Sequence, residues 1–125
     1  MDLIIGGAYQ GKTDWARAQY HLTDEDIYVC ENDVRPDLSR PCVTHLEHFA
    51  LSCLRRGEEP AEVLLKNKKL WEKSVLICND INCGIVPMEA ETRAWREACG
   101  RMLNALSSQA EHVYRIFCGL PLELK

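Results

Sequence analysis

The fold of this chain is decided by the stretch Leu3-Ile4-Ile5-Gly6-Gly7-Ala8-Tyr9-Gln10-Gly11-Lys12-Thr13, in which a short apolar run leads into a glycine-rich loop. The second part is a full match to the phosphate-binding pattern G-x-x-x-x-G-K-[ST]. In such a loop the glycines let backbone N–H groups turn toward a phosphate chain, the lysine reaches the β- and γ-phosphates, and the hydroxyl binds Mg²⁺. The pattern therefore predicts a nucleoside-triphosphate site formed by Gly6, Gly7, Ala8, Tyr9, Gln10, Gly11, Lys12 and Thr13.

The residues on both sides of this loop fit the motif. Such a loop works between a buried strand and the N-terminus of a helix, whose dipole favours an anion. Met1 to Ile5 is a short apolar run, and the segment from Lys12 to His21 contains neither glycine nor proline. This segment places Trp15 and Ala18 at helical spacing. A glycine-rich turn that met the pattern by chance would not explain these flanks.

Length and charge limit the classes of protein that the chain can represent. It has 125 residues and a net charge of −4, which predicts one domain over residues 1–125 and no basic surface for nucleic acid. The basic cluster from Lys66 to Lys69 lies beside leucines and Trp71 and is typical of a solvated helix face. The sequence has no apolar span long enough for a membrane helix and no signal peptide. We therefore expect a cytoplasmic protein.

The cysteines indicate the redox environment. Seven cysteines occur without a C-x-x-C pair, and this odd number and spacing disfavour both a disulfide framework and a zinc site. Several lie in apolar runs, where a free thiol behaves as a small hydrophobe: Cys30, Cys42, Cys78 and Cys118. We expect reduced, mostly buried thiols, as in an intracellular protein.

Apolar runs alternate with longer amphipathic segments along the chain, which indicates β-α-β units and a mostly parallel sheet. The predicted strands are residues 3–5, 27–30, 42–44, 75–78 and 113–118, and the predicted helices are 12–21, 46–56, 60–71 and 88–110. The polar segment from Glu31 to Arg40 is predicted to be a loop. The fold class is thus α/β, a P-loop NTPase-like three-layer sandwich whose five-stranded sheet is flanked by helices.

Three further motifs carry a resemblance to a known family. Asn79-Asp80 and Gly84-Ile85-Val86-Pro87 are similar to N-E-V-G-x-G-I-V-P; Arg96, Gly100 and Arg101 are similar to R-x-x-x-G-R; and Gly119, Pro121, Leu124 and Lys125 are similar to G-x-P-x-x-L-K. Together with the phosphate-binding loop, these motifs resemble those of the adenosylcobinamide kinase / adenosylcobinamide-phosphate guanylyltransferase family of cobalamin biosynthesis. The family's opening motif G-G-x-x-S-G-K-S has serine where this chain has Gln10.

The resemblance implies an activity and a set of site residues. It implies a kinase that transfers phosphate from ATP or GTP to the aminopropanol hydroxyl of a cobinamide, with Mg²⁺ as cofactor and a homotrimeric assembly. It assigns Lys12 and Asp80 to catalysis and Thr13 and Asp80 to the metal, since Asp80 stands where the family has glutamate. The alternative role for Asp80 is to cap a helix or turn.

The chain departs from the family at two functional positions. Family members carry, on a helix after the second strand, the histidine to which GMP becomes attached, whereas the segment from Glu31 to Arg40 contains no histidine. The family motif V-D-C-L-T-L-W aligns with Val43-Thr44-His45-Leu46-Glu47-His48-Phe49, so Thr44 stands where a Mg²⁺-facing aspartate is expected. Because a covalent nucleotidyl intermediate needs a nucleophile near the α-phosphate, we predict that guanylyl transfer is absent or uses another residue.

Three titratable side chains follow Thr44 within four residues. His45, Glu47 and His48 are residue types that bind metals. The two histidines also lie near the position of the family's aspartate, so either could replace the missing histidine that accepts GMP. Capping or surface positions at the start of a helix explain all three more simply. Glu47 is also a second candidate, after Asp80, for the carboxylate of the site.

Two other functions are consistent with the sequence. One is a non-catalytic nucleotide-sensing or partner-binding protein, which Thr44 and the shortened loop favour. The other is a nucleotide hydrolase or a kinase of an unrelated metabolite, because a fold does not fix a function. A carboxylate close to Thr13 in the folded protein favours an enzyme, and its absence favours the sensor.

Overall fold

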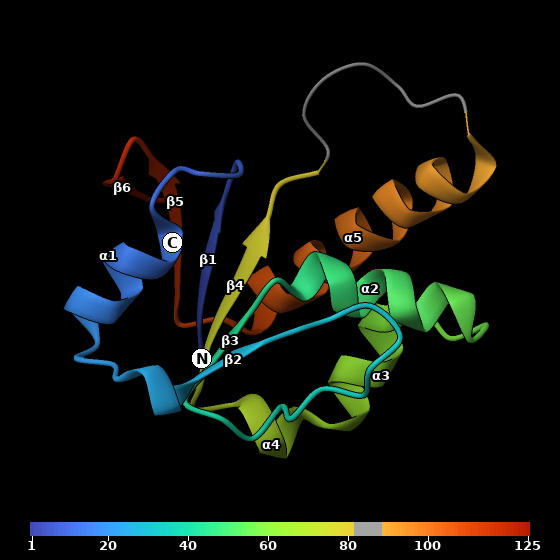
Figure 1. Cartoon of the computed structure of the whole chain (residues 1–125), viewed down its shortest axis with the longest axis horizontal. Helices are drawn as coiled ribbons and strands as arrows, with labels where there is room; N and C mark the ends of the chain where they lie inside the picture. Colours follow the sequence, from blue (N-terminus) through green and yellow to red (C-terminus); the bar gives the residue numbers. More distant parts are fainter. Residues whose placement is uncertain (82–88) are drawn as a thin grey trace.

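A six-stranded sheet lies between two layers of helices in the computed structural model, which describes residues 1–81 and 89–125 (Figure 1). The strand order is β2-β3-β4-β1-β5-β6, with β6 antiparallel to β5 and the other pairs parallel. The strands are β1 (Asp2–Gly6), β2 (Ile27–Val29), β3 (Cys42–Thr44), β4 (Val75–Asn79), β5 (His112–Phe117) and β6 (Leu120–Glu123). The glycine-rich loop follows β1, which lies inside the sheet.

The helices cover both faces of the sheet. They are α1 (Lys12–Gln19), α2 (Leu46–Arg55), α3 (Pro60–Lys66), α4 (Lys68–Trp71) and α5 (Ala90–Gln109), and a short 3₁₀ helix, η1, spans Asp24–Asp26. Helix α1 lies on one face, and α2, α3 and α5 pack together on the other (Figure 1). None of the described helices combines the length and apolar composition that crossing a bilayer requires.

The apolar run of β1 is continuous because both faces of this strand are buried. Leu3 packs in the larger core, with Phe49 of α2 and Met102 of α5, whereas Ile4 packs in the smaller core with Ala16 of α1. Leu3 and Ile4 are both fully buried. A parallel strand covered on both faces loses the apolar–polar alternation of an exposed strand, and this explains why the run predicted the strand correctly.

The α/β fold class is confirmed, but the sheet has six strands instead of the predicted five. The additional strand follows a two-residue turn in which Cys118 and Gly119 both have positive φ, 50° and 75°, as a hairpin turn of type I′ requires. The chain therefore reverses and β6 pairs with β5. Pro121 has no N–H, and a position in an edge strand tolerates this loss.

Helices α1 and α2 end at Gln19 and Arg55, slightly before their predicted ends at residues 21 and 56, and the other two predicted helices also differ from their bounds. The helix predicted over residues 60–71 is divided at Asn67, whose side-chain amide donates to the carbonyl oxygen of Val63 at 2.8 Å and whose N–H donates to Leu64 at 3.0 Å. Such local bonds compete with the regular helical ladder. The long helix begins at Ala90; its predicted start at Met88 and the Gly84-Ile85-Val86-Pro87 motif lie outside the described residues.

Two glycine substitutions are expected to change stability in opposite directions. A Cβ at Gly6 would lie 2.6 Å from the carbonyl oxygen of Ile116, so Gly6→Ala should push β1 and β5 apart and lower the free energy of unfolding by about 1–3 kcal/mol. Gly100 lies within α5 with open space around it, so Gly100→Ala should raise this free energy by about 0.5–1 kcal/mol. Urea unfolding measures both, and a Gly6→Ala protein of wild-type stability would contradict the close packing of the strands.

Candidate functional site

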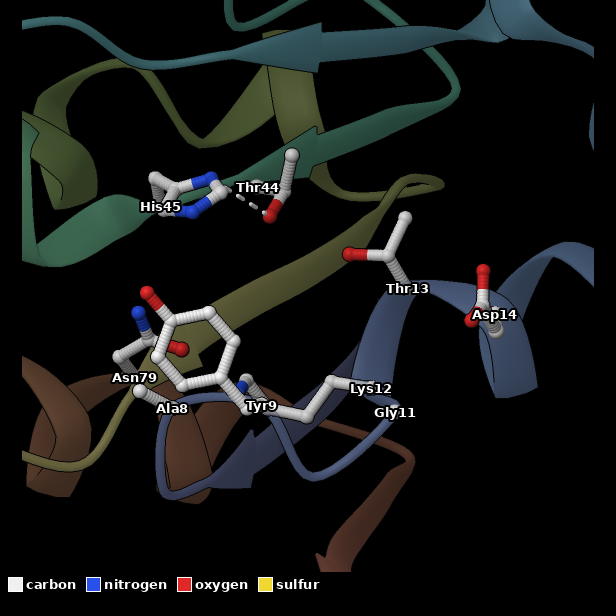
Figure 2. A pocket seen from close by; sticks show the side chains of 9 residues that line it. All are labelled: Ala8, Tyr9, Gly11, Lys12, Thr13, Asp14, Thr44, His45 and Asn79. Atoms are coloured by element: carbon white, nitrogen blue, oxygen red, sulfur yellow. Dashed lines mark hydrogen bonds between the residues drawn. The ribbon is translucent and has the colours of Figure 1, made fainter. Parts of the chain in front are cut away.

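A cavity of about 320 Å³ lies where the loop after β1 meets the carboxyl ends of β3 and β4 (Figure 2). Ligands of open α/β sheets collect at this edge. The loop contributes Ala8, Tyr9 and Gly11; the first turn of α1 contributes Lys12, Thr13 and Asp14; and the strand ends contribute Thr44, His45 and Asn79. The structure thus brings most of the predicted nucleotide-binding residues to one cavity.

Lys12 is a buried cation in this cavity. Its side chain is 7% exposed, and its ammonium donates a hydrogen bond of 2.6 Å to the carbonyl oxygen of Gly7. Burial lowers the pKa of Lys12 from its usual value, and the charge of the Glu47 carboxylate partly opposes this shift. Because the ammonium also lies at the N-terminal end of α1, the local charge favours an anionic ligand such as phosphate.

Gln10 fastens the loop to the turn between β5 and β6. Its side-chain Oε1 accepts the N–H of Cys118 at 2.7 Å, and its carbonyl oxygen accepts the N–H of Gly119 at 2.8 Å. A Cβ on Gly11 would lie 3.4 Å from the Cα of Gly119. These contacts hold the loop after β1 against the turn that contains Cys118 and Gly119.

Tyr9 forms part of the rim of the cavity. Its backbone is left-handed, with φ of 60°, a conformation that costs a residue other than glycine about 1–2 kcal/mol. The ring is fully exposed and borders the cavity (Figure 2). The tyrosine therefore gains little from packing within the described chain, while its ring remains accessible to a ligand.

Three oxygen-bearing side chains of the lining suit a hard cation. Thr13 and Asp14 lie in the first turn of α1, and Thr44, 3% exposed, lies at the end of β3. Hydroxyl and carboxylate oxygens are the ligands that Mg²⁺ prefers, so the lining fits this ion. The sequence pattern did not predict Asp14 as a lining residue, although it follows Thr13 directly.

Asp80 lies next to the cavity and is not among its described lining residues. Its N–H donates to the carbonyl oxygen of Gly6 at 2.7 Å, and its carboxylate lies 3.7 Å from Nη2 of Arg115. The side chain is 16% exposed. The structure therefore brings Lys12 and Thr13 together, and it places Asp80 one residue beyond the lining residue Asn79.

Glu47 is the buried carboxylate of this region. The residue is 2% exposed, and its two carboxylate oxygens accept the backbone N–H of Asn79 at 3.0 Å and its side-chain Nδ2 at 2.9 Å. Its backbone carbonyl accepts the indole N–H of Trp95 at 2.7 Å. Because Asn79 lines the cavity, its two bonds join Glu47 to the cavity wall, and Oε2 of Glu47 also lies 3.9 Å from Nε2 of His48.

The histidines of this region have unequal positions. His45 lines the cavity and has φ of 59°, and its ring stacks on that of His48 with centroids 5.5 Å apart. Nδ1 of His48 lies 3.2 Å from the carbonyl oxygen of Cys30. These two rings and Glu47 do not form a cluster with ligand spacing in residues 1–81 and 89–125. The donor atoms that do lie within 4.8 Å of one another belong to Asp2, Glu111 and His112, and β1 and β5 begin there.

The arginines of α5 have different environments. Arg101 pairs with Glu59, with both nitrogen–oxygen distances at 3.1 Å, and so links α5 to the start of α3. Neither Arg96 nor Arg101 is among the described lining residues of the cavity. The pairing with Glu59 favours a structural role for Arg101, the last residue of the motif formed by Arg96, Gly100 and Arg101.

A comparison with protein-family models finds a match to the chain from β3 onward. A family model described as "Cobinamide kinase / cobinamide phosphate guanyltransferase" matches residues 42–124. The matched part begins with β3 and includes Thr44, Glu47 and Asn79. The phosphate-binding loop lies before it. A search of curated proteins finds no match to this chain.

The Gln10 contact is expected to stabilise the loop measurably. Gln10→Ala removes the acceptor of the Cys118 N–H and should lower the free energy of unfolding by about 0.5–1.5 kcal/mol. Gln19→Ala, at the exposed end of α1, is the matched control and should have little effect. Urea unfolding compares the two variants, and equal stabilities would contradict the fastening role of Gln10.

Thiol reactivity is expected to separate Cys118 from the other described cysteines. Burial raises the pKa of Cys30, Cys42 and Cys99 to about 12 and that of Cys53 to about 11, and it also raises the pKa of the buried Cys78 thiol. These groups are thiols at pH 8, and thiolate is the reactive form. Cys118 is exposed.

A disulfide reagent applied to the native protein at pH 8 tests this difference. Cys118→Ser should lose one rapidly reacting equivalent relative to the wild type, while Cys53→Ser should lose none. An unchanged count in Cys118→Ser would contradict the exposed position of this thiol.

Proposed function

Since the chain belongs to the cobinamide kinase / cobinamide phosphate guanyltransferase family of cobalamin biosynthesis, we propose that it transfers the γ-phosphate of ATP or GTP to the hydroxyl of a cobinamide. The observation that carries this proposal is the cavity in which the phosphate-binding loop, Lys12 and Thr13 meet residues of the matched part of the chain. The nucleotide and the corrinoid are thus the proposed substrates.

Phosphoryl transfer requires positioning and charge neutralisation more than covalent help from the protein. The alcohol oxygen forms a bond to the γ-phosphorus, the bond from this phosphorus to the β–γ bridging oxygen breaks, and the nucleoside diphosphate leaves. The hydroxyl proton passes to a carboxylate of the site or to solvent. Lys12 and the N–H groups of the loop neutralise the phosphate oxygens. Mg²⁺ would supply further positive charge to the phosphates, and Thr13 and Asp80 are the residues proposed to hold it.

Asp80 is the proposed catalytic carboxylate. It follows Asn79 of the cavity directly, and it stands at an acidic position of the family motif. In this role it would accept the proton of the alcohol or orient a water ligand of Mg²⁺. Asp14, which lines the cavity, is the competing carboxylate, and the two aspartates can be compared by the same isosteric substitution.

Guanylyl transfer is not part of the proposed activity. The segment between β2 and β3 contains no histidine, and a covalent nucleotidyl intermediate requires such a nucleophile. His45 is the histidine that lines the cavity, and it is the residue to test if a covalent guanylylated protein is observed.

The second candidate function is a nucleotide sensor without catalysis. Thr44 favours it, because this residue lines the cavity where the family has an acidic residue, and its hydroxyl lies 3.3 Å from Nδ1 of His45. In this case the loop binds the triphosphate and a partner protein responds to the bound state.

Nucleotide binding is tested by isothermal titration with MgATP and MgGTP. Lys12→Ala should weaken binding by about 10- to 100-fold, because a hydrogen-bonded charge is lost from the phosphate site. Lys69→Ala, an exposed lysine of α4, should bind as the wild type does. Equal binding by Lys12→Ala and the wild type would contradict a phosphate-binding role for the loop.

The reaction is tested by following phosphate transfer to cobinamide with ³¹P NMR. We expect the wild type to form cobinamide phosphate, Asp80→Asn to bind nucleotide but lose at least about tenfold in rate, and Asp14→Asn to remain active. The reverse order of the two variants would assign the role to Asp14. Nucleotide binding without transfer to cobinamide would favour the sensor.

A further inference from the structure

The carboxylate of Glu47 is an unusual group to bury in this cavity wall. The residue is 2% exposed, its two carboxylate oxygens accept hydrogen bonds from Asn79, and Oε2 also lies 3.9 Å from Nε2 of His48. Burying a carboxylate is costly unless hydrogen bonds and positive charge compensate it. Here the compensation comes from the two bonds to Asn79 and from the charge of the nearby Lys12. Glu47 therefore interacts with two lining residues of the cavity, with Asn79 by hydrogen bonds and with Lys12 by charge.

These two bonds determine which way the amide of Asn79 faces. An ionised carboxylate only accepts hydrogen bonds, so the group that Asn79 presents to Glu47 is its Nδ2 amide, at 2.9 Å. The backbone N–H of Asn79 occupies the other oxygen of Glu47. The atom of the amide left for the cavity is Oδ1, and Asn79 lies across the cavity from Thr13 and Asp14 (Figure 2).

We propose that Glu47 is a positioning residue that fixes the amide of Asn79, so that Asn79 Oδ1 accepts a hydrogen bond from the hydroxyl of the phosphoryl acceptor. This inference rests on the proposed kinase function. It extends that function by naming the side chain that recognises the alcohol.

The chemistry of an amide oxygen supports this choice of ligand group. Oδ1 has no hydrogen to donate, and phosphate oxygens are also acceptors. Oδ1 therefore disfavours direct contact with the triphosphate and favours a group with a hydrogen to give. Among the groups that react in phosphoryl transfer, the acceptor hydroxyl has such a hydrogen. The cavity is thus divided into a donor side at the loop and Lys12 and an acceptor side at Asn79.

Glu47→Gln is expected to reverse the amide of Asn79. The backbone N–H of Asn79 cannot reverse, so the glutamine oxygen stays on it and the glutamine NH₂ group faces the Asn79 side chain. Asn79 then has to offer Oδ1 to this NH₂ group, which turns Nδ2 toward the cavity. The variant keeps both hydrogen bonds, but its cavity presents a donor where the wild type presents an acceptor.

The exchange of both residues is expected to restore the acceptor. Asn79→Asp alone places two carboxylates against each other and should impair the site. In the double variant Glu47→Gln/Asn79→Asp, the glutamine NH₂ group donates to one oxygen of the new aspartate, and the other oxygen faces the cavity. The double variant also has the wild-type net charge. Such rescue by exchange is the behaviour of a coupled pair.

The test measures nucleotide affinity and acceptor use separately. For Glu47→Gln we expect the dissociation constant of MgATP or MgGTP to stay within about threefold of wild type, and kcat/KM for cobinamide to fall about tenfold, as the loss of one hydrogen bond predicts. The double variant should recover most of this loss. Glu62→Gln, an exposed glutamate of α3, is the control for loss of a charge.

A structural readout accompanies the kinetics. In ¹H–¹⁵N spectra, the side-chain amide of Asn79 is the NH₂ signal that Asn79→Asp removes. We expect this signal to exchange slowly with solvent in the wild type and to shift in Glu47→Gln.

The outcomes distinguish this inference from the proposed function. Parallel losses of nucleotide affinity and thermal stability in Glu47→Gln, without rescue in the double variant, would overturn the positioning role. A rapidly exchanging Asn79 amide in the wild type would overturn it as well. A wild-type protein that binds nucleotide and phosphorylates no alcohol would overturn the proposed function, and the amide exchange would still decide whether Glu47 fixes Asn79.

Discussion

The site depends on a buried ammonium at the amino end of a helix. The position of Lys12 opposes the helix dipole, and its burial removes most of its hydration. The carbonyl oxygen of Gly7 and the buried carboxylate of Glu47 offset part of this cost. A phosphate group offsets it better, because it brings charge to both the ammonium and the N–H groups of the loop. The loop after β1, its contacts through Gln10 and the cavity together hold the Lys12 ammonium where a phosphate group can bind it.

The site also depends on where negative charge lies around the ammonium of Lys12. Thr44, at the end of β3, stands where the family motif has aspartate, and the carboxylate in this part of the chain is that of Glu47 in the first turn of α2. Thr44 faces the cavity, and the carboxylate of Glu47 is buried against Asn79. The carboxylate of Glu47 is close enough to Lys12 to interact with its charge. It contacts the cavity through its hydrogen bond to the side-chain amide of Asn79.

The elements predicted from the sequence are those that a local pattern specifies. The continuous apolar run of β1 and the glycine pattern after it predicted the sheet and the loop correctly. Strand β6 was missed because its residues, such as Leu120 at 70% exposed, have no buried face to create an alternation. The contact between Glu47 and Asn79 joins residues 32 positions apart, and it depends on the packing of α2 against β4. No spacing rule within one element reveals such a pair.

A crystal structure with Mg²⁺ and a non-hydrolysable ATP or GTP analogue tests whether the loop after β1 binds the triphosphate. We expect the triphosphate in this loop, the ammonium of Lys12 moved from Gly7 to the β- and γ-phosphates, and Mg²⁺ bound by the hydroxyl of Thr13. A nucleotide bound elsewhere, or a loop that keeps the bond from Lys12 to Gly7 with no phosphate beside it, would contradict a phosphate site at Lys12.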